Sequence, residues 1–212
     1  SSALLLARIL ASEPSAILLD EPFSALDSHL RSQLEVELAE FLSDFGGPLL
    51  WVSHDRGEVL RNCPAICVME HGRSQSVTTA QDLMHRPATE AAARLSGCEN
   101  FVDLQWVDGV LSIPQWGLTL RGPSGGHGER RRAGIRARCV RLADSDGVNT
   151  FSCRVERVVE DVSAVMLLLR PEMALPGAPP LRMELDKAAW RARNTPARLT
   201  VLIDPRDILL LE

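Results

Sequence analysis

The chain has 212 residues, of which 45 % are hydrophobic and 24 % charged, so it is long enough for one or two globular domains. A net charge of −5 argues against a nucleic-acid-binding protein, and the longest aliphatic run, residues 164–169, is far shorter than the ~20 residues of a membrane helix. Tyrosine is absent, and the only lysine is Lys187. Because Lys187 does not end a GxxxxGKS or GxxxxGKT sequence, the chain contains no phosphate-binding loop of that type.

In the first part of the chain, apolar runs of strand length alternate with runs of helical period. Residues 3–11 predict a helix, and residues 16–19 and 49–52 predict two buried parallel strands. A helix over residues 30–42 should join these strands, with Glu35 and its other glutamates off the apolar face. Strands that alternate with helices are typical of a layered α/β domain.

Smaller elements follow. Gly46-Gly47 should cap the preceding helix at its carboxyl end. Residues 56–61 then predict a short helix and residues 65–69 a third strand. His71-Gly72 is typical of a hairpin turn, and Thr79, with an aspartate three residues later, predicts the start of a small helix.

From about Gly97 the pattern changes to many short strands separated by turn residues. The clusters at residues 122–126 and 176–180 are rich in glycine and proline. This pattern predicts a separate all-β domain, a small barrel, of about 115 residues. The expected strands cover residues 101–107, 110–113, 118–121, 135–142, 151–159, 162–170, 181–185, 199–203 and 208–211.

Two sets of side chains need an explanation apart from the fold. The five cysteines are scattered, odd in number and without a CxxC pair, which predicts reduced thiols and no zinc site. The arginines between Arg121 and Arg141 predict a solvated surface or, as the alternative, a site for an anion or a partner.

The residues best suited to chemistry follow the two predicted parallel strands. Asp20 and Glu21 come directly after the first strand, and His54 comes after the second. The carboxyl ends of parallel strands lie at the sheet edge where ligands bind in open α/β folds. There, Asp20 can hold a hydrated Mg²⁺ on nucleotide phosphates, and Glu21 can orient or deprotonate an attacking water. His54 should reach the same edge.

These residues carry a resemblance to a known family. The sequence LLDEPFSALD at residues 18–27, followed by His54, resembles the ATPase subunit of ATP-binding-cassette (ABC) transporters. The resemblance implies that Asp20 ends the Walker B strand, that Glu21 is the catalytic base and that His54 is the switch histidine contacting the γ-phosphate. Ser24 and Asp27 would belong to the D-loop, which crosses the interface between two ATPase subunits and helps to bind ATP.

The resemblance covers residues 1–96, but the family's P-loop, Q-loop and LSGGQ signature are not in this sequence. We expect them upstream of Ser1, and we expect this chain alone to hydrolyse no ATP. The same residues also have local structural interpretations. The Ser24 to Asp27 segment resembles a capping box, as do Asp55 and Glu58, and these capping roles are compatible with the functional ones.

The second half resembles the regulatory TOBE domain of importer ATPases, through GIRARCVRL at residues 134–142 and LIDPRDI at residues 202–208. Residues 96–100 and 149–161 look most like molybdate or tungstate transporter ATPases. In related oxyanion-binding modules a Ser-Ala-Arg-Asn segment contacts the anion, and this chain keeps only Asn149 of it, close to Asp146. The resemblance therefore leaves oxyanion binding by the barrel open.

The sequence thus predicts part of an α/β ABC-type nucleotide-binding domain at residues 1–96 and an all-β, OB-like TOBE barrel at residues 97–212. The implied function is ATP hydrolysis, with ATP and Mg²⁺, in an importer for molybdate. The partners would be a second ATPase subunit in a homodimer and transmembrane permease subunits, at the cytoplasmic face of the plasma membrane, with no nucleic acid. The alternatives are a non-enzymatic oxyanion-sensing barrel, or an ABC ATPase for sulfate, polyamine, iron or sugar.

Overall fold

The computed structural model describes residues 14–212 except residues 25, 108–109, 125–130 and 195. The helix expected at residues 3–11 lies outside the described residues. The chain divides into two compact units, residues 1–80 (the first unit) and residues 81–212 (the second unit). No helix in the described part of the chain is long and apolar enough to span a membrane.

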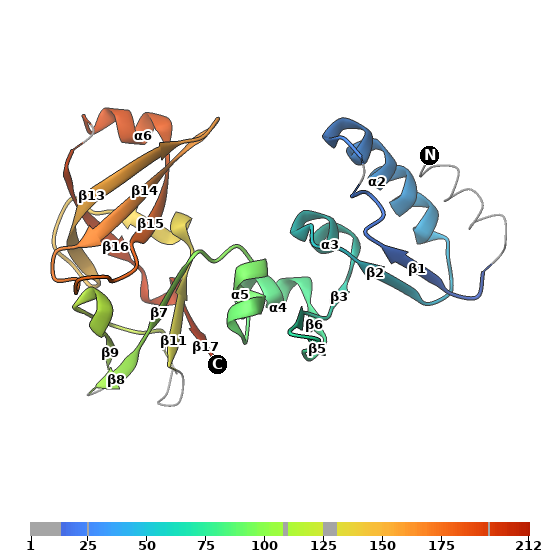
Figure 1. The fold of residues 1–212 in the computed structure, drawn as a ribbon, viewed down its shortest axis with the longest axis horizontal. Coiled ribbons are helices and arrows are strands. Elements are labelled where there is room, and N and C mark those ends of the chain that lie inside the picture. The colour runs from blue at the N-terminus through green and yellow to red at the C-terminus, as the bar shows by residue number, and fades with distance from the viewer. Residues whose placement is uncertain (1–13, 25, 108–109, 125–130, 195) are drawn as a thin grey trace. The chain divides into compact units, whose positions relative to one another are not determined.

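The first unit is built on two parallel strands and the helix between them (Figure 1). Strand β1 (Ile17–Asp20) pairs with β2 (Leu49–Val52), and helix α2 (Ser28–Ser43) connects them. Leu38 of α2 packs in one small core with Ile17, Leu19 and Phe23. The parallel pairing and the connecting helix confirm the elements predicted for this segment.

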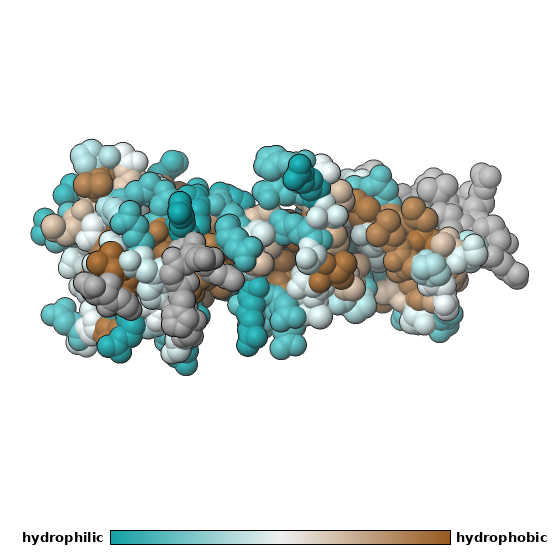
Figure 2. All heavy atoms as spheres, turned by 90° about the horizontal axis from the view of Figure 1, so that it is seen from below, coloured by the Kyte–Doolittle hydropathy of each residue, from teal (hydrophilic) through white to brown (hydrophobic). Residues whose placement is uncertain are grey.

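Strand β1 is buried on one face only, and no residue of β2 is fully buried. Side chains alternate along β1, so Ile17 and Leu19 are buried while Leu18 is 71 % exposed, and its partner Leu50 in β2 is exposed as well. The prediction of two buried strands is therefore wrong for one face of β1 and for β2 as a whole. Figure 2 shows apolar surface gathered over this part of the chain.

The rest of the first unit is made of short elements. Helix α3 (Arg56–Asn62) follows β2, and β3 (Ala65–Ile66) pairs antiparallel with β6 (Thr78–Thr79). Strands β4 (Met69–Glu70) and β5 (Arg73–Ser74) form a hairpin. The single strand predicted over residues 65–69 is therefore split between two small sheets.

Two turns of the first unit can be compared with the hairpin turn and the helix cap expected from the sequence. His71 and Gly72 both have positive φ, 50° and 76°, as a two-residue type I′ turn requires, and this confirms the predicted hairpin. Helix α2, in contrast, ends with Asp44 as its C-cap, in a right-handed conformation. The cap expected at Gly46-Gly47 is therefore wrong, because the helix ends before these glycines.

The second unit starts with two short helices, α4 (Ala80–His85) and α5 (Glu90–Leu95). Buried Arg136 donates to the carbonyl oxygen of Met84 and to Ser96 Oγ, so this helical segment is tied to the β-rich part. The second unit therefore begins before residue 97. The boundary expected between residues 96 and 97, where the ATPase part should end, stays a prediction.

Three antiparallel sheets form the β-rich part, and most of the predicted strands are confirmed. The largest sheet has the order β12-β16-β13-β14-β15, and the others have the orders β17-β11-β7 and β10-β9-β8. One large apolar core, which includes Trp116, Leu167 and Val201, draws on all three sheets. The strands are β7 (Asn100–Asp103), β8 (Gln105–Val107), β9 (Val110–Ile113), β10 (Leu118–Leu120), β11 (Arg132–Ile135), β12 (Val140–Leu142), β13 (Thr150–Glu160), β14 (Ala164–Pro171), β15 (Leu181–Asp186), β16 (Arg198–Ile203) and β17 (Ile208–Leu211).

Three features of this unit differ from the predicted pattern. The strand predicted over residues 101–107 is split into β7 and β8, which belong to different sheets. Helix α6 (Lys187–Ala192), capped by Asp186, has no counterpart in the prediction. The strand predicted over residues 135–142 is wrong in its first part: β11 ends at Ile135, a single 3-10 turn occupies Ala137–Cys139, and only β12 matches the predicted strand. Strands β11 and β12 belong to different sheets, so this turn carries the chain from one sheet to the next.

Candidate functional site

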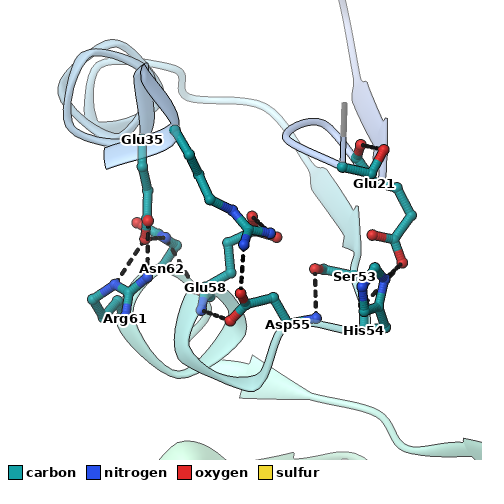
Figure 3. Close-up of polar contacts among 10 residues, drawn as sticks. Glu21, Glu35, Ser53, His54, Asp55, Glu58, Arg61 and Asn62 are labelled. Atoms are coloured by element: carbon teal, nitrogen blue, oxygen red, sulfur yellow. Dashed lines mark hydrogen bonds and ion pairs between the residues drawn. The ribbon is translucent and has the colours of Figure 1, made fainter. Parts of the chain in front are cut away.

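The ends of the two parallel strands bring Glu21 and His54 together. The last residues of the strands, Asp20 and Val52, are paired, and the Glu21 N–H donates to the Val52 carbonyl oxygen at 2.9 Å. Glu21 Oε1 then accepts the backbone N–H of His54 at 2.9 Å and lies 2.7 Å from His54 Nδ1 (Figure 3). The expected meeting of these two residues at one sheet edge is thus present in the structure.

This contact engages one ring nitrogen of His54. When the Glu21 carboxylate is ionised it can only accept a hydrogen bond, and Nδ1 of His54 is then the donor. The His54 side chain is 77 % exposed, so a ligand can reach the ring. The nitrogen available to that ligand is Nε2.

Glu21 has an unusual backbone conformation. Its φ is +46°, in the left-handed region that residues with a side chain rarely adopt and that costs about 1–2 kcal/mol. Such strain persists only where the surroundings impose it, and it gathers at functional sites. Two hydrogen bonds hold the backbone of Glu21 in this turn: its N–H donates to the Val52 carbonyl oxygen, and its carbonyl oxygen accepts from the Ser24 hydroxyl.

Ser24 and Asp27 have different roles in the turn after β1. Ser24 Oγ donates to the Glu21 carbonyl oxygen at 3.0 Å. Asp27, not Ser24, is the N-cap of α2, because its Oδ1 accepts the Leu30 N–H at 2.9 Å. The capping box expected from Ser24 is therefore wrong, whereas Asp55 caps α3 as expected by accepting the Glu58 N–H at 3.1 Å.

Asp20 stands apart from the other predicted site residues. Its side chain is exposed at the end of β1, and within the described ranges no hydrogen bond or ion pair joins it to Glu21, Ser24, Asp27 or His54. A single free carboxylate suits Mg²⁺, which keeps several waters and takes its other ligands from substrate phosphates. Accordingly, the residues that the structure covers form no group of three or more protein ligands for a metal.

A polar network between α2 and α3 was not predicted. Glu35 is 8 % exposed and accepts hydrogen bonds from Arg61 and Asn62 at 2.7–2.8 Å, so its expected place off the buried face is wrong. Arg31 bridges Asp55 and the buried carboxylate of Glu58. These partners are far apart in the sequence, so no local pattern could have identified them.

The network also changes the acidity of two carboxyl groups. The hydrogen bond from Arg61 is the main cause that holds the pKa of Glu35 below its ordinary value, and burial opposes it. The backbone N–H of Glu58 likewise lowers the pKa of Asp55, with a further contribution from the charge of Arg31. Both carboxyl groups are therefore stabilised as anions in the folded state.

In the second unit, the asparagine considered for oxyanion binding is already engaged. Asn149 has a φ of +59°, its amide Nδ2 donates to the Arg121 carbonyl oxygen, and its Oδ1 accepts the Arg121 N–H at 2.6 Å. Both ends of the side chain thus hold the backbone after β10. An anion would have to displace these bonds.

Three of the six described arginines of the basic cluster have side-chain partners. Arg132 pairs with Glu90 and Asp103, Arg136 is buried, and Arg141 pairs with Asp207. The expected solvated surface is therefore wrong for Arg136, whereas Arg141 is exposed and Arg132 is partly exposed, and both pair with neighbouring carboxylates. Arg131 and Arg138 are exposed.

Comparisons with known proteins point to one kind of relative. No protein-family model matches the chain. The chain is 32 % identical over 206 residues to the Fe(3+) ions import ATP-binding protein FbpC of Streptomyces avermitilis, covering 97 % of this chain and 57 % of the relative. It is 33 % identical over 210 residues to the spermidine/putrescine import ATP-binding protein PotA 2 of Pseudomonas aeruginosa, covering 88 % and 58 %.

A third relative is the sulfate/thiosulfate import ATP-binding protein CysA of Burkholderia mallei, 31 % identical over 190 residues that cover 88 % of this chain and 52 % of the relative. Over most of its length, the chain is thus homologous to ATP-binding subunits of ABC transporters, and it spans about half the length of these relatives. A solved structure of the molybdate-binding protein ModG aligns with 53 % of the chain at 14 % identity and a TM-score of 0.40, too low to support an argument.

Proposed function

We propose that this chain is part of the ATP-hydrolysing subunit of an ABC importer. The observation that carries the proposal is the contact of Glu21 with His54 at the carboxyl ends of two parallel strands. The homology to importer ATP-binding proteins over most of the chain supports it independently.

In this proposal Glu21 is the general base. Its carboxylate orients a water molecule for in-line attack on the γ-phosphate of ATP and accepts a proton as the bond to the leaving ADP breaks. Asp20 would hold Mg²⁺ through water. When bound with ATP, this ion neutralises negative charge on the phosphates.

His54 would stabilise the charge on the γ-phosphate. With Nδ1 protonated toward Glu21, a neutral ring presents only a lone pair at Nε2, whereas an imidazolium presents an N–H that can donate to a phosphate oxygen. The proposed role therefore requires the doubly protonated ring. The contact with Glu21 keeps the ring in one orientation for that bond.

The partners follow from the same assignment. Ser24 and Asp27, in the turn that leads into α2, would contact a second ATPase subunit across an ATP sandwich in a homodimer. Closure of the sandwich would move transmembrane permease subunits, which would place this subunit at the cytoplasmic face of the plasma membrane.

The cargo is a separate question. The relatives named above are import proteins for iron, polyamines and sulfate. They favour one of these three cargoes over molybdate. The engaged Asn149 amide also weakens the case for an oxyanion-sensing barrel. Calorimetry of the chain with molybdate, tungstate and sulfate tests that alternative, and tight binding of any of these would revive it.

The decisive experiment measures Mg²⁺-dependent ATP hydrolysis by the full-length protein. We expect Glu21→Gln to lower the rate by about 10²- to 10⁴-fold, the usual contribution of a general base. Glu37→Gln, which changes an exposed glutamate of α2, is the matched control and should leave the rate unchanged. Wild-type hydrolysis by the Glu21→Gln variant would refute the assignment.

A further inference from the structure

Helices α2 and α3 are joined by two groups of polar contacts, which we call the near clamp and the far clamp (Figure 3). The near clamp consists of Arg31, Asp55 and Glu58 and lies at the amino-terminal ends of both helices. The far clamp consists of Glu35, Arg61 and Asn62 and lies one turn further along each helix. Only the near clamp includes a residue adjacent to His54.

In the near clamp, one guanidinium bridges two carboxylates. Arg31 Nη1 lies 2.9 Å from Asp55 Oδ2, and Nη2 lies 3.3 Å from Glu58 Oε1. Asp55 uses its other oxygen to cap α3, and its own N–H donates to Ser53 Oγ at 3.0 Å. A hydrogen bond therefore joins Ser53 and Asp55, the two neighbours of His54, and Arg31 contacts Asp55 directly.

Arg31 and Glu21 belong to one continuous segment, the turn after β1 and the first turn of α2. This segment holds the chain around His54 at two points, through the Glu21 carboxylate and through the Arg31 guanidinium. We propose that Arg31 and Glu58 are positioning residues, which hold His54 in contact with Glu21 by tying the start of α2 to the start of α3.

The near clamp is poorly built for stability alone. Glu58 is 1 % exposed, and its Oε2 and the Nε of Arg31 are buried with no hydrogen-bond partner in the described part of the protein. An ion pair of this kind recovers little of the cost of burying its charges. The far clamp shows the contrast, because Arg61 binds Glu35 through two bonds of 2.8 Å and Asn62 completes the site.

The two clamps thus provide a matched comparison. Both join the same helices by an arginine and a buried glutamate, but only the near clamp adjoins His54. If the clamps serve only to pair the helices, removing either should disturb His54 equally. Positioning by the near clamp requires that only its removal disturbs the contact with Glu21.

The test follows the imidazole of His54 by NMR in the ¹⁵N-labelled chain, with its signals assigned by comparison with His54→Gln. At about pH 8.5, where histidines are mostly neutral, long-range ¹H–¹⁵N correlations distinguish a ring protonated on Nδ1 from one protonated on Nε2. The wild-type chain should show the Nδ1–H form. Glu21→Gln replaces the carboxylate acceptor and provides the reference for its loss.

We expect Arg31→Gln/Glu58→Gln, which removes the charges of half-buried Arg31 and buried Glu58, to shift His54 toward a mixture containing the Nε2–H form. The corresponding far-clamp variant, Glu35→Gln/Arg61→Gln, should keep the Nδ1–H form. Retention of that form in the near-clamp variant, or equal loss in both, would overturn the proposal. If the double variant does not fold, Arg31→Lys is judged by the same criterion, since one ammonium group cannot reproduce the planar fork of the guanidinium.

A second readout rests on the proposed function. In the full-length protein, the near-clamp variant should reduce the kcat of ATP hydrolysis by about 10- to 100-fold, the effect expected of a displaced catalytic group, with little change in KM. The far-clamp variant should keep kcat near the wild-type value. If the wild type does not hydrolyse ATP, the proposed function fails, while the NMR comparison still decides the positioning role.

Discussion

The two units of this chain achieve a defined structure in different ways. The second unit closes three antiparallel sheets around a continuous apolar core. The first unit has a small core on one side of a two-stranded sheet, leaves Leu18 and Leu50 exposed on the other side, and has ion pairs between the segments of α2 and α3. Buried apolar area dominates the stability of the second unit, whereas directional polar contacts set the geometry of the first. The candidate site lies in the first unit, where precise placement matters more than bulk stability.

The largest contrast should be seen in thiol reactivity. Burial raises the pKa of Cys98 and of Cys153 in the second unit to about 12, so only about one thiol in 10⁴ is ionised at pH 8. Cys67 of the first unit is exposed. Iodoacetamide at pH 8 followed by peptide mapping should label Cys67 at least about 10³-fold faster than the two buried thiols. Rapid labelling of Cys153 in the native protein would show that the core of the second unit is open.

Core truncation should have the next largest effect. Leu167 is fully buried in the second unit, and Leu167→Ala should lower the free energy of unfolding by about 2–5 kcal/mol. Leu175→Ala makes the same chemical change at a half-exposed position of that unit and should cost less than about 1 kcal/mol. Urea unfolding measures both. Equal effects would contradict a stability dominated by one core.

Acid should weaken the first unit. Because the folded state lowers the pKa of Glu35 and of Asp55, these groups stabilise the first unit above their ordinary pKa values, and this stabilisation is lost as the pH falls below about 4.5. NMR-monitored urea titrations at pH 7, 4 and 3 can follow each unit separately. Glu35→Gln should make the stability of the first unit less dependent on pH. An unchanged pH dependence in that variant would contradict a structural role for the Glu35–Arg61 pair.

The smallest expected effect concerns the start of α2. Asp27→Ala removes the observed cap and should destabilise the first unit by about 1 kcal/mol, whereas Ser24→Ala should change its stability by less than about 0.5 kcal/mol. Thermal unfolding followed by circular dichroism compares the two variants. A larger loss from Ser24→Ala would restore the capping box predicted from the sequence.

Local patterns predicted the features that depend on neighbouring residues. Alternating apolar runs located most strands of the second unit, because the side-chain period of a strand is two in any context. His71-Gly72 predicted the hairpin, because the positive φ angles of its turn are a property of those two residues. The meeting of Glu21 and His54 was also predictable, since parallel strands end at the same edge of a sheet.

The tertiary structure alone decided which faces are covered and which polar groups meet. The open face of β1 and β2, the burial of Glu35 and the bridge from Arg31 to Glu58 depend on how α2 packs against the sheet and against α3. The engagement of Asn149 by Arg121 likewise joins segments distant in sequence. Such contacts arise from the relative placement of whole elements, which periodicity and turn propensity do not encode. The sequence therefore determined the chemistry available at the site, and packing determined how Glu21 and His54 are held.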